Sequence, residues 1–356
     1  MKLHPLLILP VVLAGCSFSP TQSHTKAYPQ NKQIQKIVDD QVKSAKETLH
    51  PKGIFVVVAE PKTGKILGMH GWEMNIPKQY QSDTGWPARR LFEPGSTFKP
   101  VVVAAALEEG KITPKTKIFC ENGQFNYKGK SIKDHVGSAD LTFDEIIAKS
   151  SNIGASKIAL MLKDEDFYNN VCKFGFGAKT GISVPWECSG LVNPPSKWDA
   201  LTKTRMAFGQ SVAVTPIQLT MAYCALANGG KLMKPVVGDE NSVVVRRVCS
   251  KRTADLIKKA LQKTVSDQGT APLARVNGVK VAGKTGTAQA ISSKGGYLAD
   301  KFITSFAGFF PVKNPKYVIV VVVDQADLPP EKNYGGLVAA PIFSEIAGEI
   351  LKNGNK

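Results

Sequence analysis

The sequence lacks any uninterrupted run of about 18 apolar residues, so it encodes no membrane-spanning helix. Cysteine is scarce, with six in 356 residues, which excludes a disulfide-dense scaffold. Neither Cys-x-x-Cys nor His-Glu-x-x-His occurs, so no metal is implied, and the absence of Gly-x-Ser-x-Gly disfavours a Ser-His-Asp hydrolase. We therefore expect no cofactor and look to ordinary side chains for any chemistry.

What the chain does contain is typical of a folded globular protein. Hydrophobic residues make up 43% and charged residues 21%, which rules out wholesale disorder. The length gives a prior of about two domains, with one large domain still open. The 46 basic residues outnumber the 29 acidic ones, and the net charge of +17 bears on partners rather than on fold.

The N-terminus has the pattern of an export signal. Lys2 precedes an apolar run from Leu6 to Ala14, which suits a signal peptide and is too short to span a bilayer. The run ends in Gly15-Cys16 and resembles the lipobox of bacterial lipoproteins, in which the cysteine is lipidated and becomes the mature N-terminus. We predict a lipid anchor on Cys16 that tethers the protein without crossing the membrane. A plain secretory signal with an incidental cysteine is the alternative.

Export bears on partners and on cysteine chemistry. A lipid-tethered basic protein in an oxidising compartment most simply faces anionic headgroups or an anionic wall polymer. Nucleic-acid binding is the rival explanation of the charge, but export removes that partner and no nucleic-acid-reading motif is visible. Five cysteines remain after Cys16, an odd number that leaves at least one free, and Cys172 with Cys188 is one candidate pair.

Hydrophobic periodicity predicts strands, then many helices, then strands and a final helix. Capping boxes start helices at Thr142 with Glu145 and at Thr215 with Gln218. The apolar run 318–323 predicts a strand buried on both faces. The strands are expected at 54–59, 65–69, 278–282, 302–309 and 317–324, and the helices at 33–48, 96–109, 142–149, 152–162, 166–173, 216–228, 253–265 and 340–352. This order predicts an α+β fold, with helices segregated from a mostly antiparallel sheet.

The first of three short motifs is Ser96-x-x-Lys99. Pro94-Gly95 predicts a turn, and Ser96 is expected to open a helix, so Lys99 can reach its hydroxyl. Serine needs an adjacent base, and lysine is a base only when neutral; burial or a second cation such as Lys284 lowers the lysine pKa. Alone the motif is weak, because an ordinary helix start has the same pattern.

The second motif is Ser150-Ser151-Asn152, which is predicted to lie on a short turn between two helices. The Ser150 hydroxyl can relay a proton between Lys99 and an amine. The Asn152 amide can hold a backbone amide of a peptide-like substrate. Taken alone, the same three residues are compatible with a simple helix cap.

The third motif is Lys284-Thr285-Gly286-Thr287, on the edge of an expected strand. It supplies a cation, two hydroxyls and a bare backbone, which suit a carboxylate and an extended peptide added as a strand. The backbone N–H groups of Ser96 and Thr287 can together form an oxyanion hole. A surface strand with a basic residue is the ordinary alternative.

The three motifs in this order are far more specific than any one of them. Asn152 follows Ser96 by 152 − 96 = 56 residues and Lys284 by 284 − 96 = 188. The β-lactamase and penicillin-binding-protein set is Ser-x-x-Lys, Ser-Asp-Asn and Lys-Thr-Gly, here with Ser-Ser-Asn in the middle. Further matching blocks are FEPGSTFKP, SSNIGASKIAL, FGFGAKTGI, FGQSVAVTPIQLTMAYCALANGG, VAGKTGTAQ and SFAGFFPVKNPKYVIVVVV. Over roughly residues 52–352 the chain resembles the transpeptidase domain of class B (monofunctional) penicillin-binding proteins.

The resemblance implies a penicillin-binding-protein/β-lactamase-like fold, in which the active site lies between an antiparallel sheet flanked by helices and an all-helical subdomain. It implies a peptidoglycan D,D-transpeptidase on the periplasmic face of a bacterial membrane. Stem peptides would be its substrates, β-lactams its inhibitors and cell-wall synthesis proteins its partners. The site residues would be the nucleophile Ser96, the base Lys99, the proton shuttle Ser150, Asn152, and the carboxylate grip of Lys284, Thr285, Gly286 and Thr287.

Three alternatives stay open. A β-lactamase needs a base that activates water, a role for which Glu145 and Asp144 are available. A D,D-carboxypeptidase differs only in its acceptor, water in place of an amine. A β-lactam sensor or inert scaffold would keep the fold, but a scaffold would have no need of Ser96 and Lys99.

The expected organisation departs from the family in one respect. Class B members usually carry a pedestal domain before the transpeptidase domain, and only 96 − 16 = 80 residues separate Cys16 from Ser96, which leaves no room for it. We expect a signal peptide at 1–15, a linker with a short amphipathic segment at 16–50, and a transpeptidase domain at 51–356.

Overall fold

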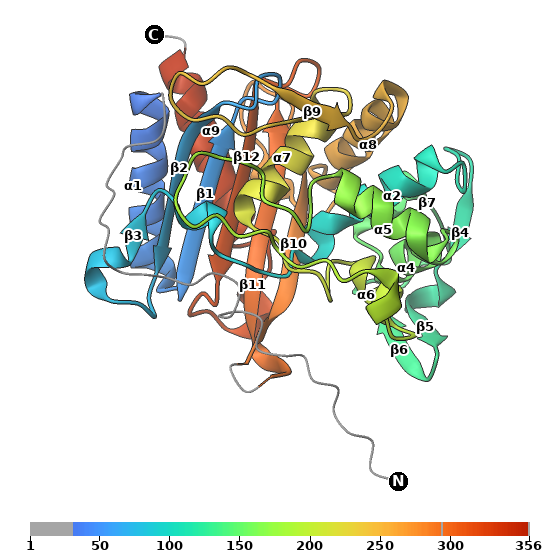
Figure 1. Ribbon diagram of the computed structural model, residues 1–356. Coiled ribbons are helices and arrows are strands. Elements are labelled where there is room, and N and C mark those ends of the chain that lie inside the picture. Colours follow the sequence, from blue (N-terminus) through green and yellow to red (C-terminus); the bar gives the residue numbers. More distant parts are fainter. Residues whose placement is uncertain (1–30, 293–294, 355–356) are drawn as a thin grey trace.

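The computed structural model describes residues 31–292 and 295–354, and its centre is a six-stranded antiparallel sheet (Figure 1). The strand order is β10–β11–β12–β1–β2–β3, so β10 forms one edge. The strands are β1 (Gly53–Ala59), β2 (Ile66–Glu73), β3 (Ser82–Asp83), β10 (Ala282–Ile291), β11 (Tyr297–Phe310) and β12 (Tyr317–Asp324). The predicted signal peptide and Cys16 lie outside the described residues.

The two central strands are buried on both faces. β1 is buried along its whole length and β12 along all but its first residue. Successive side chains of a strand point to opposite faces, so Phe55 and Val57 join one apolar cluster while Ile54 and Val56 join the other. This is the burial that the apolar run 318–323 predicted.

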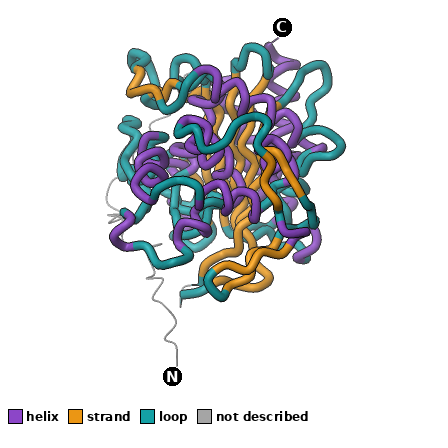
Figure 2. Tube along the Cα trace, turned by 90° about the vertical axis from the view of Figure 1, so that its right-hand side faces the viewer, coloured by secondary structure: helices purple, strands orange, loops and turns teal. Residues whose placement is uncertain are grey.

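Helices cover both faces of this sheet (Figures 1 and 2). On one face lie α1 (Lys32–Leu49) and α9 (Ala339–Gly354), and on the other lies α7 (Pro216–Ala227). The helix α1 begins at Asn31, whose side chain accepts the N–H groups of Gln33 and Ile34. Its apolar face packs into the same cluster as β1, so this segment shares the core of the domain that follows.

A group of helices extends beyond the face of the sheet on the β10 side (Figure 1). The helices are α2 (Lys99–Glu108), α3 (Phe143–Lys149), α4 (Asn152–Leu160), α5 (Asp164–Lys173), α6 (Thr202–Met206) and α8 (Lys251–Thr264). The short ribbons are β4 (Lys117–Phe119) with β7 (Asp140–Thr142), β5 (Gln124–Tyr127) with β6 (Lys130–Lys133), and β8 (Lys231–Met233) with β9 (Val244–Arg247). The sequence pattern did not predict these ribbons. Among the described helices, none combines the length and the apolar character needed to cross a bilayer.

The α+β architecture and both predicted capping boxes are confirmed, while three local predictions are wrong. The strand expected at 278–282 begins only at Ala282 and continues to Ile291, because its glycines hide a strand pattern. A Cβ on Gly283 would lie 2.4 Å from the Phe306 ring, so glycine is required there. The α-helix expected from Ser96 begins at Lys99. Cys172 is a free cysteine, which excludes its pairing with Cys188.

Candidate active site

Ser96 lies on a rigid 3₁₀ turn, Gly95–Phe98, that leads directly into α2. The Thr97 hydroxyl donates to the Pro94 carbonyl at 2.7 Å, and the buried Tyr223 hydroxyl of α7 donates to the Thr97 carbonyl at 2.9 Å. In a 3₁₀ turn, residues i and i+3 eclipse one another, so this geometry places Ser96 over Lys99 more directly than an α-helix would. The turn therefore holds the hydroxyl in one place.

The Lys99 ammonium group meets four oxygens in a fully buried setting. Its Nζ lies 2.9 Å from Ser96 Oγ, 2.6 Å from the Ser150 carbonyl, 3.1 Å from Ser150 Oγ and 2.7 Å from Asn152 Oδ1. The structure thus brings together four residues that the sequence singled out from two motifs 56 residues apart.

This environment suits a neutral amine. The Ser150 carbonyl and Asn152 Oδ1 can only accept, and a neutral amine has two N–H groups to give them. Its lone pair then faces the hydroxyls of Ser96 and Ser150, either of which can donate to it. Burial lowers the pKa of Lys99 to about 7, so a large fraction is neutral near pH 7. Lys99 can therefore take the Ser96 proton as a general base.

The second motif is positioned by two neighbouring helices and by Asp134. Ser150 ends α3 in the left-handed region, with φ of 62°, which turns both its oxygens toward Lys99. Asp134 accepts the N–H groups of Asn152 and Ile153 at 2.6 and 3.0 Å and the Ser151 hydroxyl at 2.6 Å. This carboxylate caps α4 and fixes the Asn152 side chain beside Lys99.

The third motif lies against the Ser96 turn. A Cβ on Gly286 would lie 2.7 Å from the Pro94 carbonyl, and one on Gly95 would lie 3.3 Å from the Thr287 carbonyl. Glycine at 286 is therefore needed for β10 to approach the nucleophile, a role that the sequence interpretation did not assign. Lys284 is fully buried, and burial followed by repulsion from Lys99 holds its pKa well below the usual range.

The hydroxyls of this motif have partners of their own. Thr285 and Thr287 share one face of β10, opposite to Lys284 and Gly286. The Thr285 hydroxyl lies 2.8 Å from that of Thr270 and 3.3 Å from Lys284 Nζ. The Thr287 hydroxyl accepts the Gly335 N–H at 3.1 Å. A hydroxyl pair with an ammonium group at its edge can bind a carboxylate.

Other residues considered from the sequence lie elsewhere. Glu145 accepts the Thr142 N–H in a capping box, and Asp144 pairs with Lys263, so neither carboxylate contacts the Ser96 turn in the structure. Among residues 31–292 and 295–354, no cluster of three or more His, Cys, Asp or Glu side chains is arranged to hold a metal.

Sequence reasoning missed Asp134, Thr270 and Glu93. Asp134 and Thr270 reach the motifs from 17 and 15 residues away along the chain, and nothing in their local sequence indicates a role. Glu93 was visible beside the first motif, three residues before Ser96, but its contacts are with residues more than 100 positions downstream.

The comparisons with known proteins agree with this geometry. The model of the "Penicillin binding protein transpeptidase domain" family matches residues 54–348. "Stage V sporulation protein D" of Bacillus subtilis is 34% identical over 339 residues, 89% of this chain and 52% of that protein. "Probable peptidoglycan D,D-transpeptidase PbpC" of Pseudomonas aeruginosa is 34% identical over 303 residues, 83% of this chain and 53% of that protein.

A solved structure gives the same result in three dimensions. The apo transpeptidase domain of penicillin-binding protein 3 from Burkholderia pseudomallei has a TM-score of 0.83 and 33% identity, covering 94% of this chain and 98% of that one. The chain spans about half the length of the curated relatives it matches. From its motifs, its fold and these matches, the chain belongs to the penicillin-binding protein transpeptidase family.

Proposed function

We propose that the chain is a peptidoglycan D,D-transpeptidase that works through an acyl-enzyme on Ser96 and is inhibited by β-lactams. The observation that carries the proposal is the surrounding of Lys99: two obligate acceptors for its N–H groups and two hydroxyls facing its lone pair. An amine held in this way is poised to deprotonate Ser96.

In the first half-reaction, Ser96 Oγ attacks the carbonyl carbon of the penultimate D-Ala and its proton passes to Lys99. The tetrahedral intermediate places its oxyanion near the N–H groups of Ser96 and Thr287, whose backbones lie side by side. The C–N bond then breaks, and the departing amine of the terminal D-Ala receives a proton from Lys99 through Ser150. A Ser96 ester and free D-Ala result.

In the second half-reaction, the amine of a neighbouring stem peptide attacks the Ser96 ester. The amine loses a proton to Lys99, a C–N bond forms, and Ser96 Oγ leaves and regains its proton. The terminal carboxylate of the donor peptide would be gripped by Thr285, Thr287 and Lys284 before its D-Ala departs.

Intact-protein mass spectrometry with benzylpenicillin tests the nucleophile. We expect the wild type to gain the mass of one penicillin on Ser96 and Ser96→Ala to gain none. Ser189→Ala, which removes an exposed hydroxyl, is the matched control and should be acylated like wild type. A wild-type protein that stays at its native mass contradicts the assignment.

The fate of the acyl-enzyme separates the alternatives. The carboxylates considered for a β-lactamase, Glu145 and Asp144, are engaged away from the Ser96 turn, which favours a long-lived penicilloyl adduct. A stem peptide incubated with a D-amino acid acceptor distinguishes the remaining reactions. An amide product indicates a transpeptidase, release of D-Ala alone indicates a carboxypeptidase, and penicillin binding without either product indicates a sensor or scaffold.

We propose in addition that Cys16 carries a lipid that tethers the protein to the periplasmic face of a membrane after removal of residues 1–15. The support is the apolar run that ends in Leu13-Ala14-Gly15-Cys16. Fractionation should recover the wild type with membranes and Cys16→Ser in the soluble fraction. Equal recovery of both variants with membranes contradicts the lipid anchor. The basic surface is suited to anionic headgroups or an anionic wall, and cell-wall synthesis proteins are the expected partners.

A further inference from the structure

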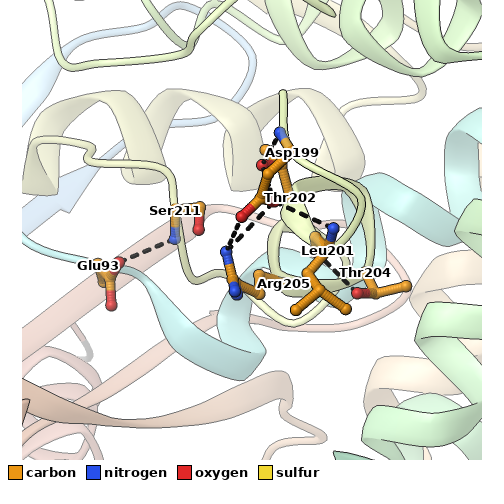
Figure 3. Close-up of polar contacts among 7 residues, drawn as sticks. All are labelled: Glu93, Asp199, Leu201, Thr202, Thr204, Arg205 and Ser211. Atoms are coloured by element: carbon orange, nitrogen blue, oxygen red, sulfur yellow. Dashed lines mark hydrogen bonds and ion pairs between the residues drawn. The ribbon is translucent and has the colours of Figure 1, made fainter. Parts of the chain in front are cut away.

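A carboxylate without a close cationic partner is buried next to the nucleophile turn. Glu93 is 8% exposed and lies three residues before Ser96. Its Oε1 accepts the Ser211 N–H at 2.8 Å, and both its oxygens accept the Tyr297 hydroxyl, at 3.1 and 3.0 Å. Figure 3 shows the Glu93 side chain directed at the Ser211 nitrogen. Together these contacts join three segments that are distant in sequence.

The nearest positive charge is already used. Arg205 lies beyond Ser211 and pairs with Asp199 at 3.0 Å (Figure 3). It favours the ionised form of Glu93 only from a distance, and burial raises the pKa of Glu93 to about 7 despite the bonds from Ser211 and Tyr297. An ionised carboxylate in this place costs stability, so its presence needs a compensating role.

The segment that contains Glu93 is joined to the 209–214 loop. Phe92 and Val214 exchange two backbone hydrogen bonds of 3.0 and 2.9 Å, and the Gly95 N–H donates to the Gly209 carbonyl at 3.1 Å. Gly209 has a φ of 79°, and a Cβ there would lie 2.1 Å from the Gly95 carbonyl. The loop is thus packed directly against the residues that lead into Ser96.

Tyr297 links Glu93 to the third motif. It is the first residue of β11 and pairs with Ile291 at the end of β10, so it lies at the tip of the β10–β11 hairpin. The other end of β10 carries Lys284 and Thr285. A hydrogen bond from Tyr297 to Glu93 therefore ties this hairpin to the turn that holds Ser96.

We propose that Glu93 is a positioning residue that clamps the Ser96 turn to the β10–β11 hairpin and to the 209–214 loop, setting the separation between the nucleophile and the Lys-Thr-Gly strand. The inference rests on the proposed function only in taking Ser96 as the nucleophile. The clamp acts through Ser96 and β10 and does not contact substrate.

The main test measures the acylation rate constant and the dissociation constant for benzylpenicillin separately. Because a misplacement of about 1 Å costs on the order of a hundredfold in rate, we expect Glu93→Ala to slow acylation about a hundredfold with Kd changed less than about threefold. Tyr297→Phe removes one hydroxyl and should slow acylation about tenfold by the same reasoning. Glu93→Gln, which can still accept from Ser211 and donate to Tyr297, should recover most of the rate.

Matched controls separate positioning from general damage. Glu187 is also buried and accepts the N–H groups of Thr180 and Gly181, so Glu187→Gln alters a comparable carboxylate elsewhere in the fold. Tyr317→Phe removes a hydroxyl at the start of β12, beside Phe310. Both controls should acylate at the wild-type rate. Since the ionised Glu93 is costly above pH 7, Glu93→Gln is expected to unfold at no lower temperature than wild type at pH 8.

Deuterium exchange gives a readout that does not depend on catalysis. Glu93→Ala should speed exchange both in the 94–98 turn and in the β10–β11 hairpin, and Glu187→Gln in neither. Wild-type acylation rates in both Glu93→Ala and Tyr297→Phe, or exchange that rises in one segment only, overturn the clamp. A wild type that fails to react with penicillin contradicts the proposed function, while the exchange experiment still decides the clamp.

Discussion

The centre of the sheet and its β10 edge bury their residues equally well and for opposite ends. In β12 the buried positions between Tyr317 and Asp324 are all valine or isoleucine. At the β10 edge, the fully buried side chains include Lys284, and Lys99 is buried across the cleft from it. Apolar burial at the centre stabilises the fold, whereas burial of ammonium groups at the edge opposes it.

This difference shows where the molecule invests its stability. The pKa of both lysines is lowered by burial, which means that the fold holds them against their preference for water. A neutral lysine beside a serine is the chemical return, because only the neutral amine accepts a proton. The central strands supply the stability that allows this strained edge to persist.

The largest effect is expected from replacing the buried base. Lys99→Met keeps the length of the side chain and removes the proton acceptor, so the acylation rate should fall by about a thousandfold or more. The rate is measured by intact-protein mass spectrometry over time with benzylpenicillin. Lys157→Met is the matched control, since Lys157 lies on α4 and pairs with Glu121 away from Ser96. Acylation of Lys99→Met at near the wild-type rate would mean that another group is the base.

The centre of the sheet should respond in the opposite way. Val321→Ala removes two buried methyl groups from β12 and should lower the free energy of unfolding by about 2 kcal/mol. The acylation rate of the folded fraction should stay at the wild-type value, because Val321 packs into the cluster on the α1–α9 face. Urea unfolding and the penicillin assay are run on the same samples. A large loss of acylation at full folding would join the two regions that the comparison separates.

The sequence foretold the centre better than the edge. An unbroken run such as 318–323 determines its own burial, because few other structures can bury every residue. The short motifs identified Ser96, Lys99, Ser150, Asn152 and Lys284 by residue type and spacing, and the structure brings them together.

What the sequence could not predict depends on contacts distant in the chain. Asp134 caps α4 from a hairpin outside the motif, and Glu93 meets Tyr297, 204 residues away. The start of β10 was misplaced because Gly283 and Gly286 have weak strand propensity, and the reason for them lies in Phe306 and Pro94. Such residues are chosen by what surrounds them in space, which periodicity does not record.

The pH dependence of acylation should reveal the buried amine directly. The pKa of Lys99 is lowered to about 7, so the neutral base is lost as pH falls, and the rate should drop about tenfold per pH unit well below 7 and level off above it. Glu93 also titrates near this pH, so the profile is measured in Glu93→Gln as well as in wild type. A rate that stays constant between about pH 5.5 and 8 in both proteins contradicts a lowered pKa at Lys99.

The smallest effect tests whether the charges at the cleft are tuned one by one. Asp134 raises the pKa of Lys99 against the larger effect of burial, so Asp134→Asn should shift the acid limb of the acylation profile to lower pH by less than about one unit. Asparagine keeps a carbonyl oxygen for the Asn152 and Ile153 N–H groups, which preserves the cap. Asp140→Asn, an exposed carboxylate on β7, is the control and should leave the profile unchanged. An upward shift in Asp134→Asn would show that its loss acts through geometry rather than charge, and the buried edge would then have to be treated as one coupled unit.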